Sequence, residues 1–204
     1  MTVGNNWDIC ALFTDGGLIG SNPSPKGGTW AWCGVSKDGE HVREVSGYLL
    51  TKGAPEGAGN PRVRSDVVAN NDSEWYAAMR ALEAMPEGWS GILASDSSVT
   101  LSRLQKIRDG EFLRTFRMDW WGRANRAFGR LGKVQFVQLA GHPTKKQLED
   151  GYKLTEDGQR VKVSRHQVWC DSACSELAKT YDSRVVGWQT YVAHGLPGLE
   201  VDAA

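Results

Sequence analysis

The chain has 204 residues, a length typical of one large domain or of one domain with insertions. Lys plus Arg and Asp plus Glu both number 24, so the formal net charge is zero, and 40% of the residues are hydrophobic. This composition excludes a disordered chain, a coiled coil and a collagen-like chain, and no apolar stretch is long enough to cross a bilayer. The first residues lack the basic and apolar regions of a signal peptide. We therefore expect a soluble, cytoplasmic protein with no membrane partner.

Three strands are expected in the first 50 residues. Residues 7–14 form a mostly apolar run that ends at Asp15, and residues 29–35 and 41–49 form two further runs. An Asp-Gly pair between the second and third runs predicts a hairpin, so these two strands should be antiparallel. Residues 51–64 are rich in Gly and Pro and are interpreted as a loop.

The rest of the chain alternates between helical and strand patterns. The expected elements are a helix at about 72–85, a strand at 91–95, helices at 97–109 and 117–131, a strand at 134–140, a hairpin inserted within 143–165, and a helix at about 167–180. This order predicts an α/β chain with a mixed sheet.

Four carboxylates fall close to the ends of predicted elements: Asp15, Glu74, Asp96 and Asp171. Each has a structural explanation on its own, as a turn residue, a helix cap or an acid in a first helical turn. If the fold brings them together, the negative charge needs cations to neutralise it. Carboxylate oxygens suit Mg²⁺ or Mn²⁺.

A zinc site is an alternative that the sequence also offers. His166, Cys170 and Cys174 have a spacing that puts them on one helical face, and His142 could supply a fourth ligand. The other interpretation is that the thiols are buried and reduced, since a free cysteine behaves as a small hydrophobic residue. We favour buried thiols.

Four motifs resemble those of the ribonuclease H type 1 family. They are FTDGG at 13–17, NNDSEWYAA at 70–78, ASDS at 94–97 and WCDSACSELA at 169–178. The resemblance implies an RNase H-like five-stranded mixed sheet flanked by helices, with strands one to three antiparallel and strand four parallel to strand one. It also implies a catalytic domain over residues 1–182, with two insertions at about 51–64 and 143–165. Residues 183–204 would form a C-terminal tail.

The same resemblance implies an endoribonuclease that hydrolyses the RNA strand of RNA/DNA hybrids with two Mg²⁺ ions, or with Mn²⁺. Asp15 would bridge both ions, Glu74 and Asp96 would complete one ion, and Asp171 would complete the other. His142 would assist proton movement and product release. The residues implied to contact the hybrid are Gly16, Asn22, Asn70 and Asn71. We expect a monomer, and the sequence identifies no replication partner.

The sequence departs from the family pattern in three places: residues 51–64 are longer than the usual connection before the first helix, His142 and Asp171 are far apart, and the stretch between Asp96 and the fifth strand is too short for the full basic protrusion of many members. The 143–165 insertion separates His142 from Asp171, which the family keeps close, and His166 is the competing candidate because it is nearer to Asp171. Residues 103–133 contain nine basic and three acidic residues. This stretch either contacts phosphates or is a solvated helix face.

Two other functions remain open at this stage. A resolvase- or transposase-like nuclease has the same fold and a carboxylate cluster but acts on DNA. A noncatalytic nucleic-acid-binding module would retain the fold without the activity. The NNxxE motif at 70–74 favours the hybrid nuclease over the first, and the presence of all four acids favours an enzyme over the second.

Overall fold

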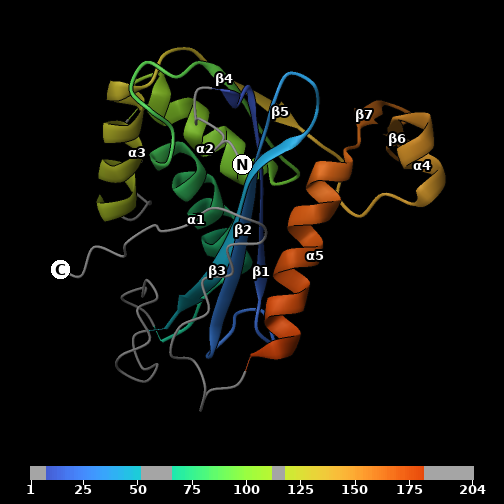
Figure 1. Ribbon diagram of the computed structural model, residues 1–204. Coiled ribbons are helices and arrows are strands. Elements are labelled where there is room, and N and C mark those ends of the chain that lie inside the picture. Colours follow the sequence, from blue (N-terminus) through green and yellow to red (C-terminus); the bar gives the residue numbers. More distant parts are fainter. Residues whose placement is uncertain (1–7, 52–65, 112–117, 182–204) are drawn as a thin grey trace, which may run out of the picture.

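A computed structural model describes residues 8–51, 66–111 and 118–181 (Figure 1). Its main sheet has the strands β1 (Ala11–Leu18), β2 (Gly27–Val35), β3 (His41–Leu50), β4 (Gly91–Ser95) and β5 (Val134–Gln138). The long helices are α1 (Asn70–Glu83), α2 (Ser98–Arg108), α3 (Met118–Arg130) and α5 (Arg165–Thr180). Between β5 and α5 the chain forms α4 (Lys145–Asp150), β6 (Tyr152–Leu154) and β7 (Arg160–Lys162).

The order of the main sheet is β3-β2-β1-β4-β5. β1 pairs antiparallel with β2, and β2 with β3, whereas β1 pairs parallel with β4, and β4 with β5. The antiparallel pairing of β1, β2 and β3 and the parallel pairing of β1 with β4 are the directions that the resemblance implied, and the fold is RNase H-like. The predicted mixed sheet with flanking helices is therefore confirmed.

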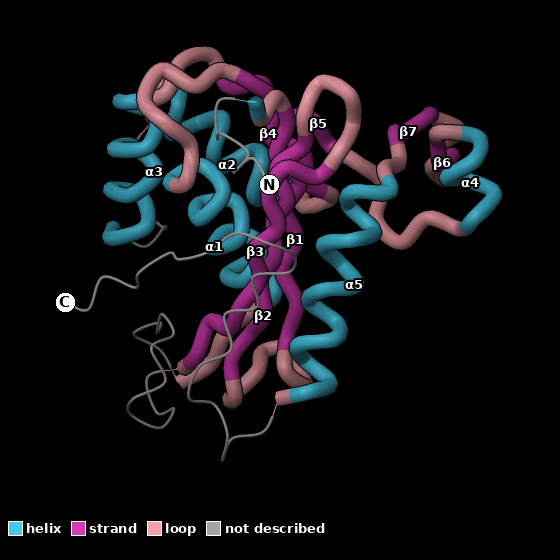
Figure 2. Tube along the Cα trace, viewed as in Figure 1, coloured by secondary structure: helices cyan, strands magenta, loops and turns pink. Residues whose placement is uncertain are grey.

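Helices cover both faces of this sheet (Figures 1 and 2). α1, α2 and α3 lie on one side, and α5 lies on the other. The helical stripe expected on α1 is buried, with Trp75 and Leu82 fully inaccessible and Met79 nearly so. On the opposite face Cys170 and Cys174 of α5 pack against β2. Because β2 lies between these two layers, it is buried along its whole length.

The chain departs from the predicted boundaries in three places. β1 runs past Asp15 to Leu18, because Gly16 and Gly17 continue the pairing with β2 instead of turning. α5 begins at Arg165, so Asp171 lies in its second turn and not at its start. The short α4 was not predicted.

Some expectations lie outside the described residues. These are the loop expected at 51–64, apart from its first residue, and the tail expected at 183–204. Among the helices of the described ranges, none has both the length and the apolar character needed to cross a membrane.

Candidate active site

The central strands bring two of the four predicted carboxylates together. In the parallel pairing of β1 with β4, Leu12 lies opposite Leu93 and Phe13 opposite Ala94. The same register, continued by two positions, places Asp15 beside Asp96. Carboxyl ends of neighbouring parallel strands are a common location for sites in open α/β sheets.

Asp15 is the most deeply buried member of this group, with 8% of its surface exposed. Burial, followed by the neighbouring charge of Asp96 and by smaller effects from Asp171 and Glu74, raises the pKa of Asp15 from an ordinary value of 3.8 to about 8. The backbone N–H of Gly16 donates to Asp15 Oδ1 at 2.9 Å and opposes the shift. The other three predicted carboxylates therefore all lie close enough to Asp15 to act on its ionisation. We call Asp15, Glu74, Asp96 and Asp171 the acidic cluster.

Glu74 reaches the cluster from α1, which lies directly against β1. A Cβ atom on Gly16 would stand 2.1 Å from the backbone nitrogen of Glu74, so this close approach requires glycine. Asn70 Nδ2 donates to Glu74 Oε1 at 2.7 Å, and the Ser97 hydroxyl donates to the other carboxylate oxygen. Burial raises the pKa of Glu74, and these two hydrogen bonds oppose the rise. The side chain is thus held at both oxygens.

Asp96 follows β4 and is held from α5. Gln167 Nε2 donates to Asp96 Oδ1 at 3.3 Å and to the Thr14 carbonyl at 3.2 Å. Burial raises the pKa of Asp96, and the nearby charge of His142 lowers it. Gln167 is 2% exposed, and its Oε1 atom has no hydrogen-bond partner among the described residues. The sequence analysis missed this residue, because a lone glutamine near the start of a helix gives no signal of its own.

A cavity of about 220 Å³ opens beside Asp96 and Asp171. Gln167, His142 and Pro143 also line it, together with Val168. His142 Nδ1 lies 3.5 Å from Asp171 Oδ2, and the histidine side chain is 79% exposed. Two members of the acidic cluster therefore line the same cavity as His142, the first candidate for the functional histidine.

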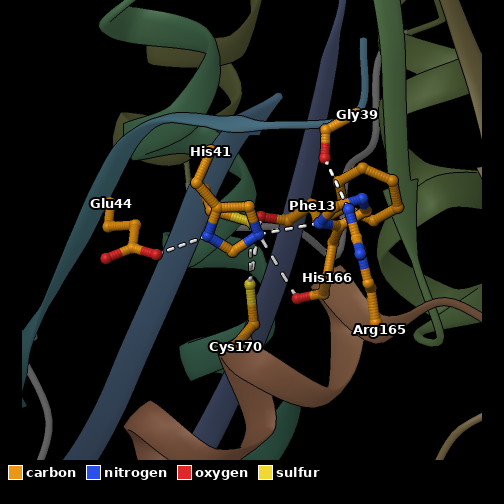
Figure 3. A network of polar contacts seen from close by, with 8 residues as sticks. Phe13, Gly39, His41, Glu44, Arg165, His166 and Cys170 are labelled. Carbon is orange, nitrogen blue, oxygen red and sulfur yellow. Dashed lines mark hydrogen bonds and ion pairs between the residues drawn. The ribbon is translucent and has the colours of Figure 1, made fainter. Parts of the chain in front are cut away.

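His166, the competing candidate, faces a different part of the molecule (Figure 3). Its Nδ1 lies 2.7 Å from His41 Nε2, and its ring packs 4.8 Å from that of Phe13. A hydrogen bond with Cys33 and another with Glu44 raise the pKa of His41 to about 9. Burial and the charge of His41 lower the pKa of His166. His166 therefore accepts a hydrogen bond from a charged neighbour and does not line the cavity.

The zinc alternative is not supported by these positions. His142 lies at the cavity, whereas Cys170 Sγ contacts the Phe13 carbonyl at 3.3 Å and Cys174 Sγ contacts the Asp15 carbonyl at 3.5 Å. Both thiols are buried and free, and burial raises the pKa of each. They are packing residues on the side of α5 that faces the sheet, as the favoured interpretation predicted.

The residues expected to contact a hybrid lie on β1, on the connection between β1 and β2, and on α1. Gly16 packs against the start of α1, and Asn70 binds Glu74. Asn71 is exposed in the first turn of α1, and Asn22 is exposed in the connection between β1 and β2. Asn70 and Gly16 thus have structural contacts of their own.

The basic stretch 103–133 is partly used inside the fold. Arg123 donates from Nε and Nη2 to the two carboxylate oxygens of Glu83, at 2.7 and 2.6 Å, and Arg130 donates to the Leu82 carbonyl at 2.9 Å. These bonds tie α3 to the end of α1. At least these two cations are structural.

The donor set fits a hard divalent cation. The cluster offers carboxylate oxygens only, and burial, together with the charge of neighbouring acids, raises the pKa of Asp15, Glu74 and Asp96. Within residues 8–51, 66–111 and 118–181, no three His, Cys, Asp or Glu side chains stand in a ready ligand geometry. The acids gather in one region without forming a preformed ligand set.

Comparisons with known proteins give matches among solved structures. No protein-family model matches the sequence, and no curated protein matches it. Among solved structures, RNase H1 from the halophilic archaeon Halobacterium salinarum NRC-1 is 20% identical, with a TM-score of 0.43 over 63% of this chain and 84% of that one. The N-terminal RNase H domain of Rv2228c from Mycobacterium tuberculosis, solved as a fusion with maltose-binding protein, is 10% identical, with a TM-score of 0.49 over 81% and 97%.

A third similar structure is LC11-RNase H1 in complex with an RNA/DNA hybrid, which is 18% identical. Its TM-score is 0.47 over 64% of this chain and 85% of that one. The RNase H-like fold follows from the strand order and directions described above.

Proposed function

We propose that this protein is a metal-dependent endoribonuclease that hydrolyses the RNA strand of RNA/DNA hybrids. The observation that carries the proposal is the convergence of four carboxylates from β1, α1, β4 and α5, each from a separate motif. Gathering four like-charged groups in a partly buried region is costly, because the charges repel one another and lose solvation. An uncompensated cluster of this kind marks a functional site more often than a structural one.

Asp15, Glu74, Asp96 and Asp171 are the residues that would hold Mg²⁺ or Mn²⁺. A bound divalent ion supplies charge stabilisation at the scissile phosphate and a more acidic water. The chain's own contribution is positioning: Gln167 orients Asp96, while Asn70 and Ser97 orient Glu74.

Recognition of RNA is assigned to Glu74 and Asn70, and proton movement to His142. A 2′-hydroxyl both donates and accepts hydrogen bonds, and it is the group that separates RNA from DNA. Glu74 and Asn70 together offer an acceptor and a donor at the cluster edge. His142 is exposed beside Asp171, and an imidazole can both accept and donate a proton.

The test is cleavage of four labelled substrates of one sequence in Mg²⁺: an RNA/DNA hybrid, duplex RNA, duplex DNA and a DNA junction. We expect the RNA strand of the hybrid alone to be cut. Asp15→Asn should abolish cutting, and Asp150→Asn, at an exposed acid of α4, should not. Cutting of the junction would assign a DNA nuclease instead, and binding without cutting would assign a noncatalytic module.

A further inference from the structure

The insertion between β5 and α5 contacts the loop that carries His142. This loop, residues 139–144, is called the histidine loop. The backbone N–H of Ala140 donates to the Lys162 carbonyl of β7 at 2.8 Å. Lys153 of β6 donates from Nζ to the Gly141 carbonyl at 3.1 Å. Each strand of the β6–β7 hairpin therefore holds one of the two residues that precede His142.

The histidine loop has a conformation that needs such support. His142 has a φ of 47°, in the left-handed region that non-glycine residues rarely adopt. Its side chain is 79% exposed and has one polar contact, with Asp171, among the described residues. Residues in this region persist where the surrounding structure fixes them. The contacts that fix this loop are made by the backbone of Gly141 and of Ala140, one and two positions before His142.

The loop is also pressed against the acidic cluster. A Cβ atom on Gly141 would stand 2.5 Å from Asp96 Oδ2, so the backbone at this point lies directly on that carboxylate. Displacement of Gly141 would therefore change the distance between the histidine loop and both Asp96 and Asp171.

The β6–β7 hairpin is itself stabilised by strand pairing and by a cation–π contact. β6 and β7 pair in register from Tyr152 opposite Lys162 to Leu154 opposite Arg160, and the Arg160 guanidinium lies 4.4 Å from the centre of the Tyr152 ring. On the far side of His142, Thr144 caps α4 through a reciprocal pair of hydrogen bonds with Gln147. The histidine loop is thus held at both ends by the insertion.

We propose that Lys153 is a positioning residue, whose ammonium group holds the Gly141 carbonyl and so sets His142 against Asp171. The inference rests on the role of His142 under the proposed function. A charged donor to a carbonyl is stronger than a neutral one, and the long lysine side chain spans from the hairpin to the loop. The insertion separates His142 from Asp171 in the sequence. Through Lys153, the same insertion then holds the two side chains close together in the structure.

The activity test uses Lys153→Met, which keeps most of the side-chain volume and removes the donor. We expect kcat on the hybrid to fall about 10-fold with KM nearly unchanged, since a small misplacement of a catalytic group is costly. Lys153→Arg should recover most of the rate. Lys146→Met, at an exposed lysine of α4, is the matched control and should behave as wild type. A higher, salt-dependent KM with normal kcat would show that Lys153 binds the substrate directly and would overturn the proposal.

A double variant separates this proposal from the proposed function. His142→Ala combined with Lys153→Met should be no slower than His142→Ala alone, because the lysine acts through the histidine. Additive losses would overturn the positioning role. If His142→Ala has wild-type activity, the role of the histidine itself is wrong, and the positioning role fails with it.

Amide hydrogen exchange provides a readout that needs no activity. Lys153→Met should speed exchange of the Ala140 amide and of the rest of the histidine loop, with exchange in β4 and α5 unchanged. Lys146→Met should leave the loop protected. Unchanged exchange in the histidine loop of Lys153→Met would overturn the proposal even if the wild-type protein cleaved none of the substrates.

Discussion

His142 Nδ1 lies 3.5 Å from Asp171 Oδ2, although α4, β6 and β7 stand between these two residues in the chain. An exposed pair of this kind contributes little to stability. Its significance lies in the position of the imidazole, which borders the same cavity as Asp96 and Asp171. His166 is closer to Asp171 in sequence but packs against Phe13 and His41.

The first prediction compares these two histidines. His142→Ala should lower kcat on the hybrid by about 10- to 100-fold without abolishing activity, as expected for a proton-transfer aid that is not a metal ligand. His166→Ala should lower the melting temperature and have a much smaller effect on the rate than His142→Ala, because the ring of His166 is packed against its neighbours. Single-turnover rates and thermal melts of both variants give the answer. A reversal of the two effects on rate would show that His166 is the functional histidine.

The second prediction concerns the cost of the acidic cluster. The pKa of Asp15 is raised to about 8, so the folded chain binds this proton more tightly than the unfolded chain does. The stability linked to this group is complete below about pH 4 and is lost as the pH rises towards 8. In EDTA, Asp15→Asn should match wild type at about pH 4 and below, and should melt at a higher temperature than wild type by a margin that grows up to pH 8. A variant that melts well below wild type at every pH would make Asp15 a structural hydrogen-bonding residue.

The third prediction follows from the same proton. Mg²⁺ binding to the cluster requires an ionised Asp15, so binding should release a proton, and affinity should rise by about tenfold per pH unit below pH 8. Mg²⁺ should also stabilise wild type by mass action and stabilise Asp15→Asn less. Melting temperatures across a Mg²⁺ titration at pH 6, 7 and 8 measure both effects. Equal Mg²⁺ stabilisation of the two proteins would place the bound ion elsewhere.

The fourth prediction tests how closely α1 approaches β1. Gly16→Ala puts a Cβ atom 2.1 Å from the Glu74 backbone nitrogen, which cannot move without shifting α1. We expect a loss of about 3 kcal/mol or more in the free energy of unfolding. The control is Gly129→Ala on α3, where a Cβ atom meets nothing within 4 Å and should add about 0.5–1 kcal/mol. Denaturant unfolding of both variants measures the difference, and a stable Gly16→Ala would contradict the packing described here.

Much of this architecture could be predicted because its signals are local. The strand at 91–95 was placed correctly from its apolar run, and the buried stripe of Trp75, Met79 and Leu82 from its helical spacing. The topology came from the four motifs, whose order matched a known fold. Asp15 was placed at a strand end because Gly16 and Gly17 resemble a turn, and local pattern cannot reveal that both pair with β2.

The contacts that position the site are long-range and escaped prediction. Gln167 meets Asp96 across 71 positions of sequence, and its role depends on the packing of α5 against the sheet. Lys153 meets Gly141 only because β6 and β7 fold back on the histidine loop. A capping pair at Thr144 and Gln147 did mark α4, but the helix is too short to show a periodic pattern.

The most direct measurement of the central claim is the chemistry of the cleaved RNA ends. Water attack at a metal-bound phosphate releases the 3′ oxygen, whereas attack by the 2′-hydroxyl leaves a cyclic phosphate. We predict 5′-phosphate and 3′-hydroxyl ends from the RNA strand of a hybrid in Mg²⁺, with no cleavage in EDTA and none by Asp15→Asn. Cyclic-phosphate ends, or cleavage that survives EDTA, would contradict a carboxylate-bound metal as the basis of activity.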